Sequence, residues 1–165
     1  MEKNNIVLIG MPASGKSTVG VILAKILGMD FVDTDILIQK INGQRLNEII
    51  DTQGVDAFLD IEEKALLSLN ISNTVIATGG SAIYSKKGME SLKKTSKAVY
   101  LKVSKQEIFA RLKDIRERGV VLIDDQSMDD MYLERTKLYE KYADITVSED
   151  GHSIEETVQA IIGMI

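Results

Sequence analysis

The sequence predicts an α/β fold, a three-layer sandwich in which a parallel β-sheet carries helices on both faces. Two observations lead to this prediction. Short apolar runs with strand character alternate with longer segments of helical period along the chain. The first apolar run, Ile6 to Ile9, leads directly into the glycine-rich segment Gly10 to Ser17, after which a helical pattern begins. Strands that alternate with helices pair in parallel, so both faces of the sheet are expected to be covered.

The expected elements follow one another in a regular order, without repeats, linkers or low-complexity tracts. Strands are predicted over residues 5–10, 31–32, 74–77, 97–103 and 145–147. Helices are predicted over residues 16–27, 36–41, 46–50, 55–69, 87–94, 105–114 and 128–142, and over the residues that follow 153.

Turn residues mark the ends of the first helices. Gly28 is expected to stop the helix that begins at residue 16, because glycine readily adopts the left-handed conformation found just beyond helix ends. Asn42-Gly43 and Gln53-Gly54 separate the three helices that follow.

Two serines have the spacing of a capping box, in which a serine and a glutamate three residues later satisfy each other's backbone N–H groups. These pairs are Ser104 with Glu107 and Ser153 with Glu156, so a helix is expected to begin after each serine. Between them, residues 115–127 have no clean apolar period and are expected to form a lid over a binding site.

Length and composition indicate one globular domain over residues 1–165. The chain is 44% hydrophobic and 27% charged, and it has no cysteine, which excludes disulfides and thiolate metal sites. No apolar run is long enough to span a membrane, and the first residues do not resemble a signal peptide, so we expect a cytoplasmic monomer. The net charge of −5, with scattered basic residues, argues against nucleic-acid binding.

The segment Gly10 to Ser17 has the spacing G-x-x-x-x-G-K-S, which is typical of loops that bind the phosphates of a nucleotide. The glycines allow the backbone to wrap closely around a phosphate, and the following helix turns its positive end toward the same anion. Lys16 is expected to reach the outer phosphates, and the hydroxyl group of Ser17 is expected to bind Mg²⁺. A glycine-rich turn without a ligand is the alternative interpretation.

Polar or glycine-rich residues follow three of the predicted strands, where ligands bind in parallel α/β sheets. Asp33 and Asp35 follow the second strand, and on an extended segment their side chains would face the same side. Phosphoryl transfer needs an acid near Mg²⁺ and another near the attacking hydroxyl, although one aspartate could instead only cap a helix. Gly79 and Gly80 follow the third strand and could offer backbone N–H groups to a substrate, but a tight turn would explain them equally well.

Four segments together resemble the shikimate kinase family: GMPASGKST at 10–18, FVDTD at 31–35, VIATGG at 75–80 and ERTKLYEKYADITV at 134–147. The resemblance runs from about residue 6 to residue 147. It implies a five-stranded P-loop kinase sheet in the order 2-3-1-4-5, substrate-binding helices over about 36–69 and a mobile lid. It also implies transfer of the γ-phosphoryl group of ATP to the 3-hydroxyl group of shikimate, with Mg²⁺.

The resemblance also implies site residues. The catalytic residues would be Lys16, Asp35, which contacts the substrate hydroxyls and serves as base, and Arg118 of the lid. Ser17 and Asp33 would hold Mg²⁺. Substrate would contact Asp35, Gly79, Gly80 and Arg135. Arg135 would bind the carboxylate of the substrate. The nucleotide would contact Ala13, Ser14, Gly15, Lys16, Ser17, Thr18, Arg111, which stacks on adenine, and Arg118. Without the resemblance, a solvated helix face would be the preferred interpretation of Arg111 and Arg135.

The sequence departs from the family pattern mainly where substrate would bind. Leu59 stands where the family has an arginine that helps to bind the shikimate carboxylate, and Ser81 replaces a third glycine. Arg45 is a candidate substitute for the missing cation. Ile154 replaces a proline near adenine, and the single histidine, His152, is expected to lie in a surface loop.

Three functions are therefore weighed. The first is a shikimate kinase, and the second is a kinase of the same fold that acts on another small hydroxy acid or amino acid, such as homoserine, which Leu59 supports. The third is a nucleotide-binding module without activity, which the presence of Lys16, Asp33 and Asp35 disfavours.

Overall fold

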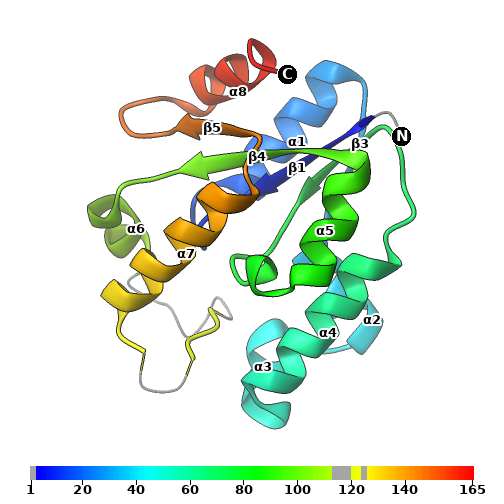
Figure 1. The fold of residues 1–165 in the computed structure, drawn as a ribbon, viewed down its shortest axis with the longest axis vertical. Helices are drawn as coiled ribbons and strands as arrows, with labels where there is room; N and C mark the ends of the chain where they lie inside the picture. The colour runs from blue at the N-terminus through cyan, green and yellow to red at the C-terminus, as the bar shows by residue number, and fades with distance from the viewer. Residues whose placement is uncertain (1–2, 113–119, 124–125) are drawn as a thin grey trace.

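A computed structural model describes residues 3–112, 120–123 and 126–165. Its centre is a parallel five-stranded sheet in the order β2-β3-β1-β4-β5 (Figure 1). This confirms the predicted fold class and strand order. The strands are β1 (Asn5–Ile9), β2 (Asp30–Asp33), β3 (Thr74–Ala77), β4 (Ser96–Lys102) and β5 (Ile145–Ser148).

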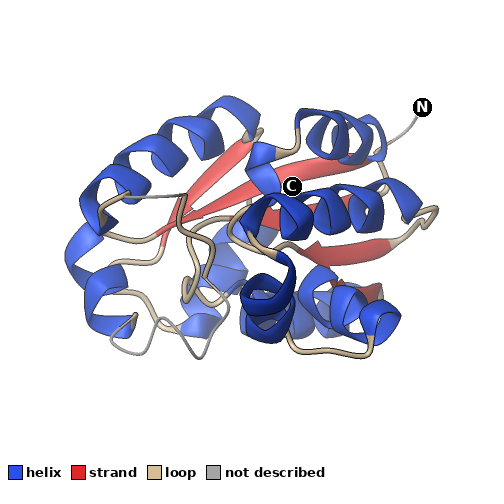
Figure 2. Ribbon diagram, turned by 90° about the horizontal axis from the view of Figure 1, so that it is seen from below, coloured by secondary structure: helices blue, strands red, loops and turns tan. Residues whose placement is uncertain are grey.

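Helices surround the sheet, as the view in Figure 2 shows. The bounds of the α-helices are α1 (Lys16–Leu27), α2 (Thr34–Asn42), α3 (Leu46–Gln53), α4 (Val55–Ser68), α5 (Lys86–Thr95), α6 (Lys105–Arg111), α7 (Met128–Tyr142) and α8 (Ile154–Ile162). A short 3-10 helix, η1 (Ala82–Tyr84), follows β3 and was not predicted from the sequence.

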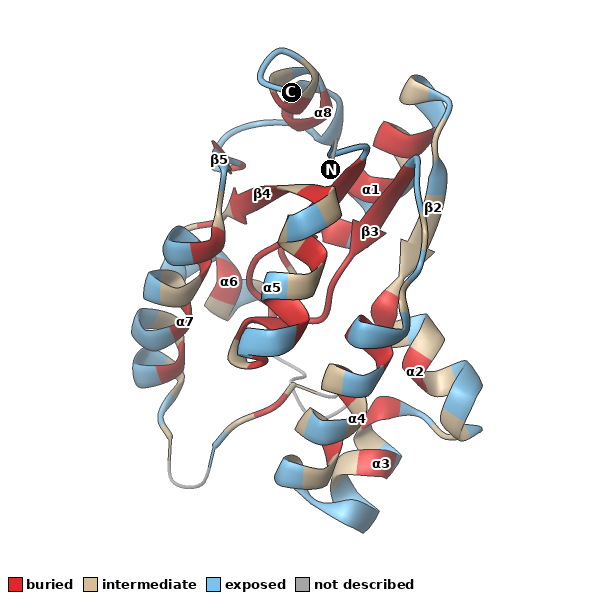
Figure 3. Cartoon of the chain, turned by 45° about the vertical axis from the view of Figure 1, so that its right-hand side comes forward, coloured by how far each residue is buried: buried red, intermediate tan, exposed pale blue. Residues whose placement is uncertain are grey.

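Successive residues of β1 face opposite sides of the sheet and divide the core into two layers. Ile6 and Leu8 pack against α1 and α8, with Val19 and Val158 among their neighbours in one buried cluster. Val7 and Ile9 face the other layer, which α4, α5, α6 and α7 cover. Because both faces are buried, the strand is apolar from Ile6 to Ile9, as parallel strands between two helical layers are. Figure 3 shows the buried strands β3 and β4, the partly exposed edge strand β2 and the exposed outer faces of the helices.

A third apolar cluster lies beyond the sheet, where α2, α3 and α4 pack together around Ile38, Ile49 and Phe58. Val121, from the segment that follows α6, is 2% exposed and belongs to the same cluster. These helices correspond to the segment expected to bind substrate, and Val121 brings part of the expected lid segment against them.

The predicted capping boxes have different outcomes. The box at Ser153 is confirmed, since Ser153 and Glu156 each accept a hydrogen bond from the other's backbone N–H. The prediction at Ser104 is wrong in one half. Ser104 Oγ accepts from the backbone N–H of Glu107 at 3.4 Å, but the Glu107 carboxylate pairs with Arg111 and the Ser104 N–H donates to Asp150.

Much of the expected lid, 115–127, lies outside the described residues, and this includes Arg116 and Arg118. Within the described part of the chain, no helix is long and apolar enough to cross a membrane.

Candidate active site

A cavity of about 340 Å³ opens at the carboxyl ends of β1, β2 and β3. Three of the predicted site segments meet in it, namely the glycine-rich loop, the start of α2 and the residues after β3. The rest of the wall is formed by Arg135 of α7, by Val120 and Val121, and by Leu46 and Phe58 of the α2–α4 cluster. The lining residues from the predicted set are Ala13, Gly15, Lys16, Ser17, Thr18, Asp35, Gly79, Gly80 and Arg135.

The glycine-rich loop between β1 and α1 is held by the side chain of Lys16. Its Nζ donates to the carbonyl oxygens of Gly10 at 2.8 Å and Met11 at 2.6 Å, and to Ser14 Oγ at 3.2 Å. Gly15, at the start of α1, has a φ of 80°, a left-handed conformation that favours glycine. Burial lowers the pKa of Lys16 to about 8 against the opposing effect of Asp35. The loop thus holds a buried cation at the N-terminus of a helix, which suits a phosphate.

The hydroxyl group of Ser17 donates to Asp33 Oδ2 at 2.5 Å. The other oxygen of Asp33 caps α2, because it accepts from the backbone N–H groups of Asp35 at 2.9 Å and Ile36 at 3.2 Å. A hydroxyl and a carboxylate beside a phosphate loop fit Mg²⁺, which uses few protein oxygens and completes its shell with substrate phosphates and water. No group of three or more acidic, histidine or cysteine residues suited to a metal occurs among the described residues.

The predicted geometry of the two aspartates is wrong, although both lie at the site. Helix α2 begins at Thr34, so Asp33 ends a strand and Asp35 lies in the first turn of a helix. They therefore do not face one side of an extended segment. Asp33 points to Ser17, and Asp35 lines the cavity. Burial, followed by the charge of Asp33, raises the pKa of Asp35 to about 6, which suits a group that accepts a proton near neutral pH.

Gly79 and Gly80 lie where the loops from β1, β2 and β3 come closest. A β-carbon at Gly80 would lie 2.6 Å from Pro12 Cδ, and one at Gly79 would lie 2.7 Å from Asp35 Oδ1. The Gly80 carbonyl accepts from the hydroxyl of Tyr139 at 2.6 Å. A larger residue at position 80 would push against Pro12 of the glycine-rich loop, and one at position 79 would displace the carboxyl groups of Asp35 and Glu62, so close packing explains both glycines.

Arg135 is 1% exposed, which excludes the solvated helix face considered from the sequence. Its Nε donates to the hydroxyl of Tyr84 at 3.3 Å, its guanidinium carbon lies 5.3 Å from the centre of the Tyr84 ring, and its Nη2 donates to the Val121 carbonyl. These contacts hold the guanidinium at the cavity wall, on the side of the α2–α4 cluster, where it could bind a carboxylate.

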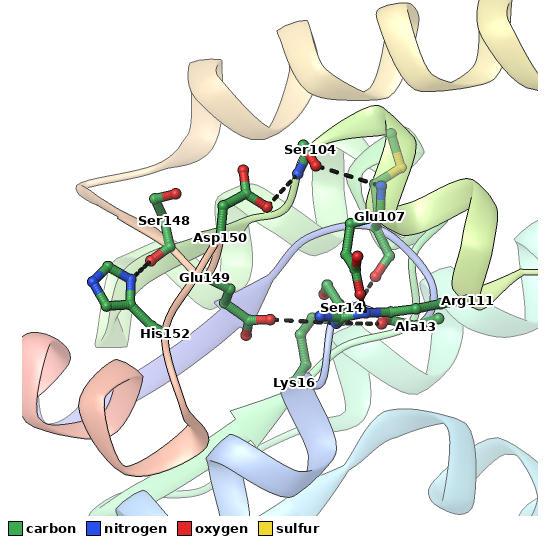
Figure 4. Close-up of polar contacts among 11 residues, drawn as sticks. Ala13, Ser14, Lys16, Ser104, Glu107, Arg111, Ser148, Glu149, Asp150 and His152 are labelled. Atoms are coloured by element: carbon green, nitrogen blue, oxygen red, sulfur yellow. Dashed lines mark hydrogen bonds and ion pairs between the residues drawn. The ribbon is translucent and has the colours of Figure 1, made fainter.

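Arg111 lies at the edge of the loop and does not line the cavity. Figure 4 shows its guanidinium between three acceptors. Nη1 donates to the Ala13 carbonyl at 3.1 Å and lies 3.5 Å from Glu149 Oε2, and Nε donates to Glu107 at 2.9 Å. Glu149 was not identified from the sequence. It lies just after β5, at the carboxyl end of a strand, and that position is the signal that could have found it.

Glu62 of α4 was also missed. Its side chain is almost fully buried, and it accepts a hydrogen bond from Ser81 Oγ at 2.7 Å. The sequence contains one indication of it, since Glu62 is four residues after Phe58 and three before Ala65, and therefore lies on the buried face of the helix.

Three further residues lie away from the cavity. Leu59 lines a separate hollow with Val55 and Ile123, and Arg45 is exposed at the start of α3. His152 is exposed, as expected, and its Nδ1 lies 3.0 Å from the carbonyl oxygen of Ser148.

The family model for shikimate kinase matches residues 12–165. A shikimate kinase of Thermodesulfovibrio yellowstonii is 38% identical over 96% of this chain and 92% of its own length. A shikimate kinase of Haemophilus influenzae is 34% identical over 99% of this chain and 93% of its own length. Among solved structures, shikimate kinase from Acinetobacter baumannii in complex with shikimate has a TM-score of 0.89 and 29% identity, covering 98% of this chain and 92% of its own. Shikimate kinase from Aquifex aeolicus has a TM-score of 0.84 and 32% identity, covering 96% of this chain and 94% of its own.

Proposed function

The chain belongs to the shikimate kinase family, and from this premise we propose that it transfers the γ-phosphoryl group of ATP to the 3-hydroxyl group of shikimate. The observation that best supports the proposal is the continuity of the cavity. Its walls run from the phosphate loop at Lys16 past Asp35 to Arg135. A phosphoryl donor and a carboxylated acceptor can therefore lie side by side in one cavity, as direct transfer requires.

On the donor side, the loop backbone and Lys16 bind the phosphates. Lys16 donates to the neutral carbonyl groups of Gly10 and Met11, and a charged phosphate oxygen is a stronger acceptor than either of them. Ser17 and Asp33 would hold Mg²⁺, which when bound supplies charge neutralisation for the β- and γ-phosphates.

On the acceptor side, Arg135 binds the shikimate carboxylate and Asp35 faces the hydroxyl group that reacts. The hydroxyl oxygen forms a bond to the γ-phosphorus while the bond from that phosphorus to the ADP oxygen breaks, and the hydroxyl proton passes to Asp35. The raised pKa of Asp35, about 6, favours this acceptance.

A second candidate is a kinase of the same fold that uses another hydroxy acid or an amino acid, such as homoserine. The specific observation in its favour is that Leu59 is apolar and lines a separate hollow. Among the described residues, Arg135 is therefore the one arginine in the cavity wall. A substrate with a smaller or less strongly bound carboxylate would suit a single guanidinium.

Release of ADP tests both candidates. The purified chain is incubated with ATP, Mg²⁺ and a panel that contains shikimate, homoserine and other hydroxylated acids, and ADP is measured for each. We expect the highest rate with shikimate, in a reaction that stops when Mg²⁺ is chelated. A higher rate with another acceptor would favour the second candidate.

A further inference from the structure

The carboxyl group of Glu62 is buried directly behind the acceptor side of the cavity. It projects from α4 and is 1% exposed. Ser81, which lines the cavity, donates to its Oε2 at 2.7 Å. Oε1 is also buried and has no hydrogen-bond partner among the described residues. A buried carboxyl oxygen without a partner is costly, so this oxygen needs an explanation in terms of its neighbours.

Asp35 presents a carboxyl oxygen to the same side of Gly79. A β-carbon at Gly79 would lie 2.7 Å from Glu62 Oε1 and also 2.7 Å from Asp35 Oδ1. Both oxygens, one from α4 and one from α2, therefore border the same small space beside the α-carbon of Gly79. The absence of a side chain at Gly79 leaves the space in which the two carboxyl groups meet.

Two carboxyl groups that are buried this close together cannot both carry a charge without a large penalty. The charged groups that act on Glu62 are Asp35 of α2, which disfavours its ionisation, and Arg135 of α7, which favours it. Burial is the largest effect and raises the pKa of Glu62 to about 7, against the opposing hydrogen bond from Ser81. A proton on Oε1 would remove the second charge and give this oxygen a partner.

We propose that Glu62 is a positioning residue for Asp35: Ser81 fixes its carboxyl group, and its free oxygen carries a proton that it donates to Asp35 Oδ1. The other oxygen of Asp35 is then turned toward the cavity, where the acceptor hydroxyl binds. This role rests on the proposed function, because it acts through the group that receives the substrate proton. It also explains a serine at residue 81, since a glycine there would leave Glu62 without an anchor.

Four variants test the role. Glu62→Gln retains a group that can donate to Asp35 and another that can accept from Ser81, whereas Glu62→Met has a similar length and neither group. Glu63→Gln is the matched control. Glu63 lies next to Glu62 on α4 and does not line the cavity, and it accepts a similar hydrogen bond from Ser85 Oγ at 2.6 Å. The fourth variant, Ser81→Ala, removes the anchor.

We expect Glu62→Gln to retain most of the kcat of the natural chain with shikimate, as the control does. Glu62→Met should lose about 10- to 150-fold in kcat, the effect of one hydrogen bond to a charged group, with an unchanged KM for ATP. Equal losses in Glu62→Gln and Glu62→Met would overturn the proposal, because the charge of Glu62 would then be what matters. Full activity in Glu62→Met would also overturn it.

The link through Ser81 is tested by a double-mutant cycle. Ser81→Ala should lower kcat, and its combination with Glu62→Met should be no worse than Glu62→Met alone, because both changes remove one interaction. Losses that multiply would show that Ser81 acts independently and would contradict the pair.

A spectroscopic measurement separates this proposal from the proposed function. The infrared difference spectrum of the natural chain minus Glu62→Gln, without substrate at neutral pH, should contain the C=O stretching band of a protonated carboxyl group. A carboxylate band in its place would overturn the proposal, whichever acceptor the enzyme uses. Failure of the natural chain to phosphorylate shikimate would instead count against the proposed function alone.

Discussion

The guanidinium group of Arg111 joins the phosphate loop to the turn after β5, because its Nη1 lies 3.1 Å from the Ala13 carbonyl and 3.5 Å from Glu149 Oε2 (Figure 4). The second oxygen of Glu149 is buried and has no hydrogen-bond partner in the described part of the chain. It would lie 3.6 Å from a β-carbon at Gly15. A negative charge therefore lies beside the loop that is proposed to bind phosphates.

This arrangement predicts that Glu149→Gln binds nucleotide more tightly. The change removes a charge that repels phosphate, while Ala13 and Glu107 still hold Arg111. We expect the Kd for ADP, measured by calorimetry, to fall roughly three- to tenfold. Glu107→Gln is the control, since Glu107 is exposed, and it should change the Kd little. Weaker binding in Glu149→Gln would mean that Glu149 mainly holds Arg111 in place.

Lys16→Ala should lower turnover by a large factor and leave the fold intact. Among the described residues, the ammonium group bonds to the loop around it and to no other segment, so its removal takes away charge rather than core packing. We expect kcat to fall by about 10²–10³-fold, with an unchanged circular dichroism spectrum. A variant that retains near-normal turnover would refute the proposed role of Lys16.

Stability should depend on pH through Glu62. Its pKa in the folded chain, about 7, lies above the ordinary value of 4.5, so the folded state favours the protonated form. The contribution to the free energy of unfolding is present in full below about pH 4.5 and is lost as the pH rises through about 7. It amounts to about 3 kcal/mol.

Urea unfolding at pH 5 and pH 8 checks this dependence. Glu62→Gln cannot ionise, so its stability relative to the natural chain should be higher at pH 8 than at pH 5. An equal difference at the two pH values would show that Glu62 does not change its protonation between them.

The regular elements could be predicted from the sequence, since apolar period and helix caps are local signals. The predicted bounds agree with the structure for β3 and α7, and the glycine-rich loop identified the centre of the site. The start of α2 was missed because its apolar period begins at Ile36, after the polar residues that form its first turn.

Glu62 and Glu149 were missed, because a place on the buried face of α4 and a place just after β5 are weak signals by themselves. Their partners, Ser81 and Arg111, are distant in the sequence, and the contacts arise only when separate strands and helices pack together. The same reason applies to Arg135, whose sequence pattern could not separate a buried helix face from a solvated one.

Leu59→Arg should improve the binding of shikimate. Residue 59 lines a hollow beside the cavity, so the longer arginine side chain has to extend from α4 toward Arg135 of α7 to add a second charged contact. Such a contact typically contributes ~1.5–3 kcal/mol, or roughly a 10- to 150-fold change in affinity. We expect a lower KM for shikimate and little change for ATP. If the natural chain already binds shikimate tightly and the variant does not improve it, residue 59 does not contribute to the carboxylate site or its change is already compensated.

The most direct test of the central claim is the ratio of kcat/KM for shikimate to that for homoserine, measured on the natural chain with saturating ATP and Mg²⁺. The site proposed here holds a carboxylate at Arg135 and a ring hydroxyl at Asp35, so the ratio should exceed about 100. A ratio below one, with efficient turnover of homoserine, would contradict the assignment of shikimate as the substrate.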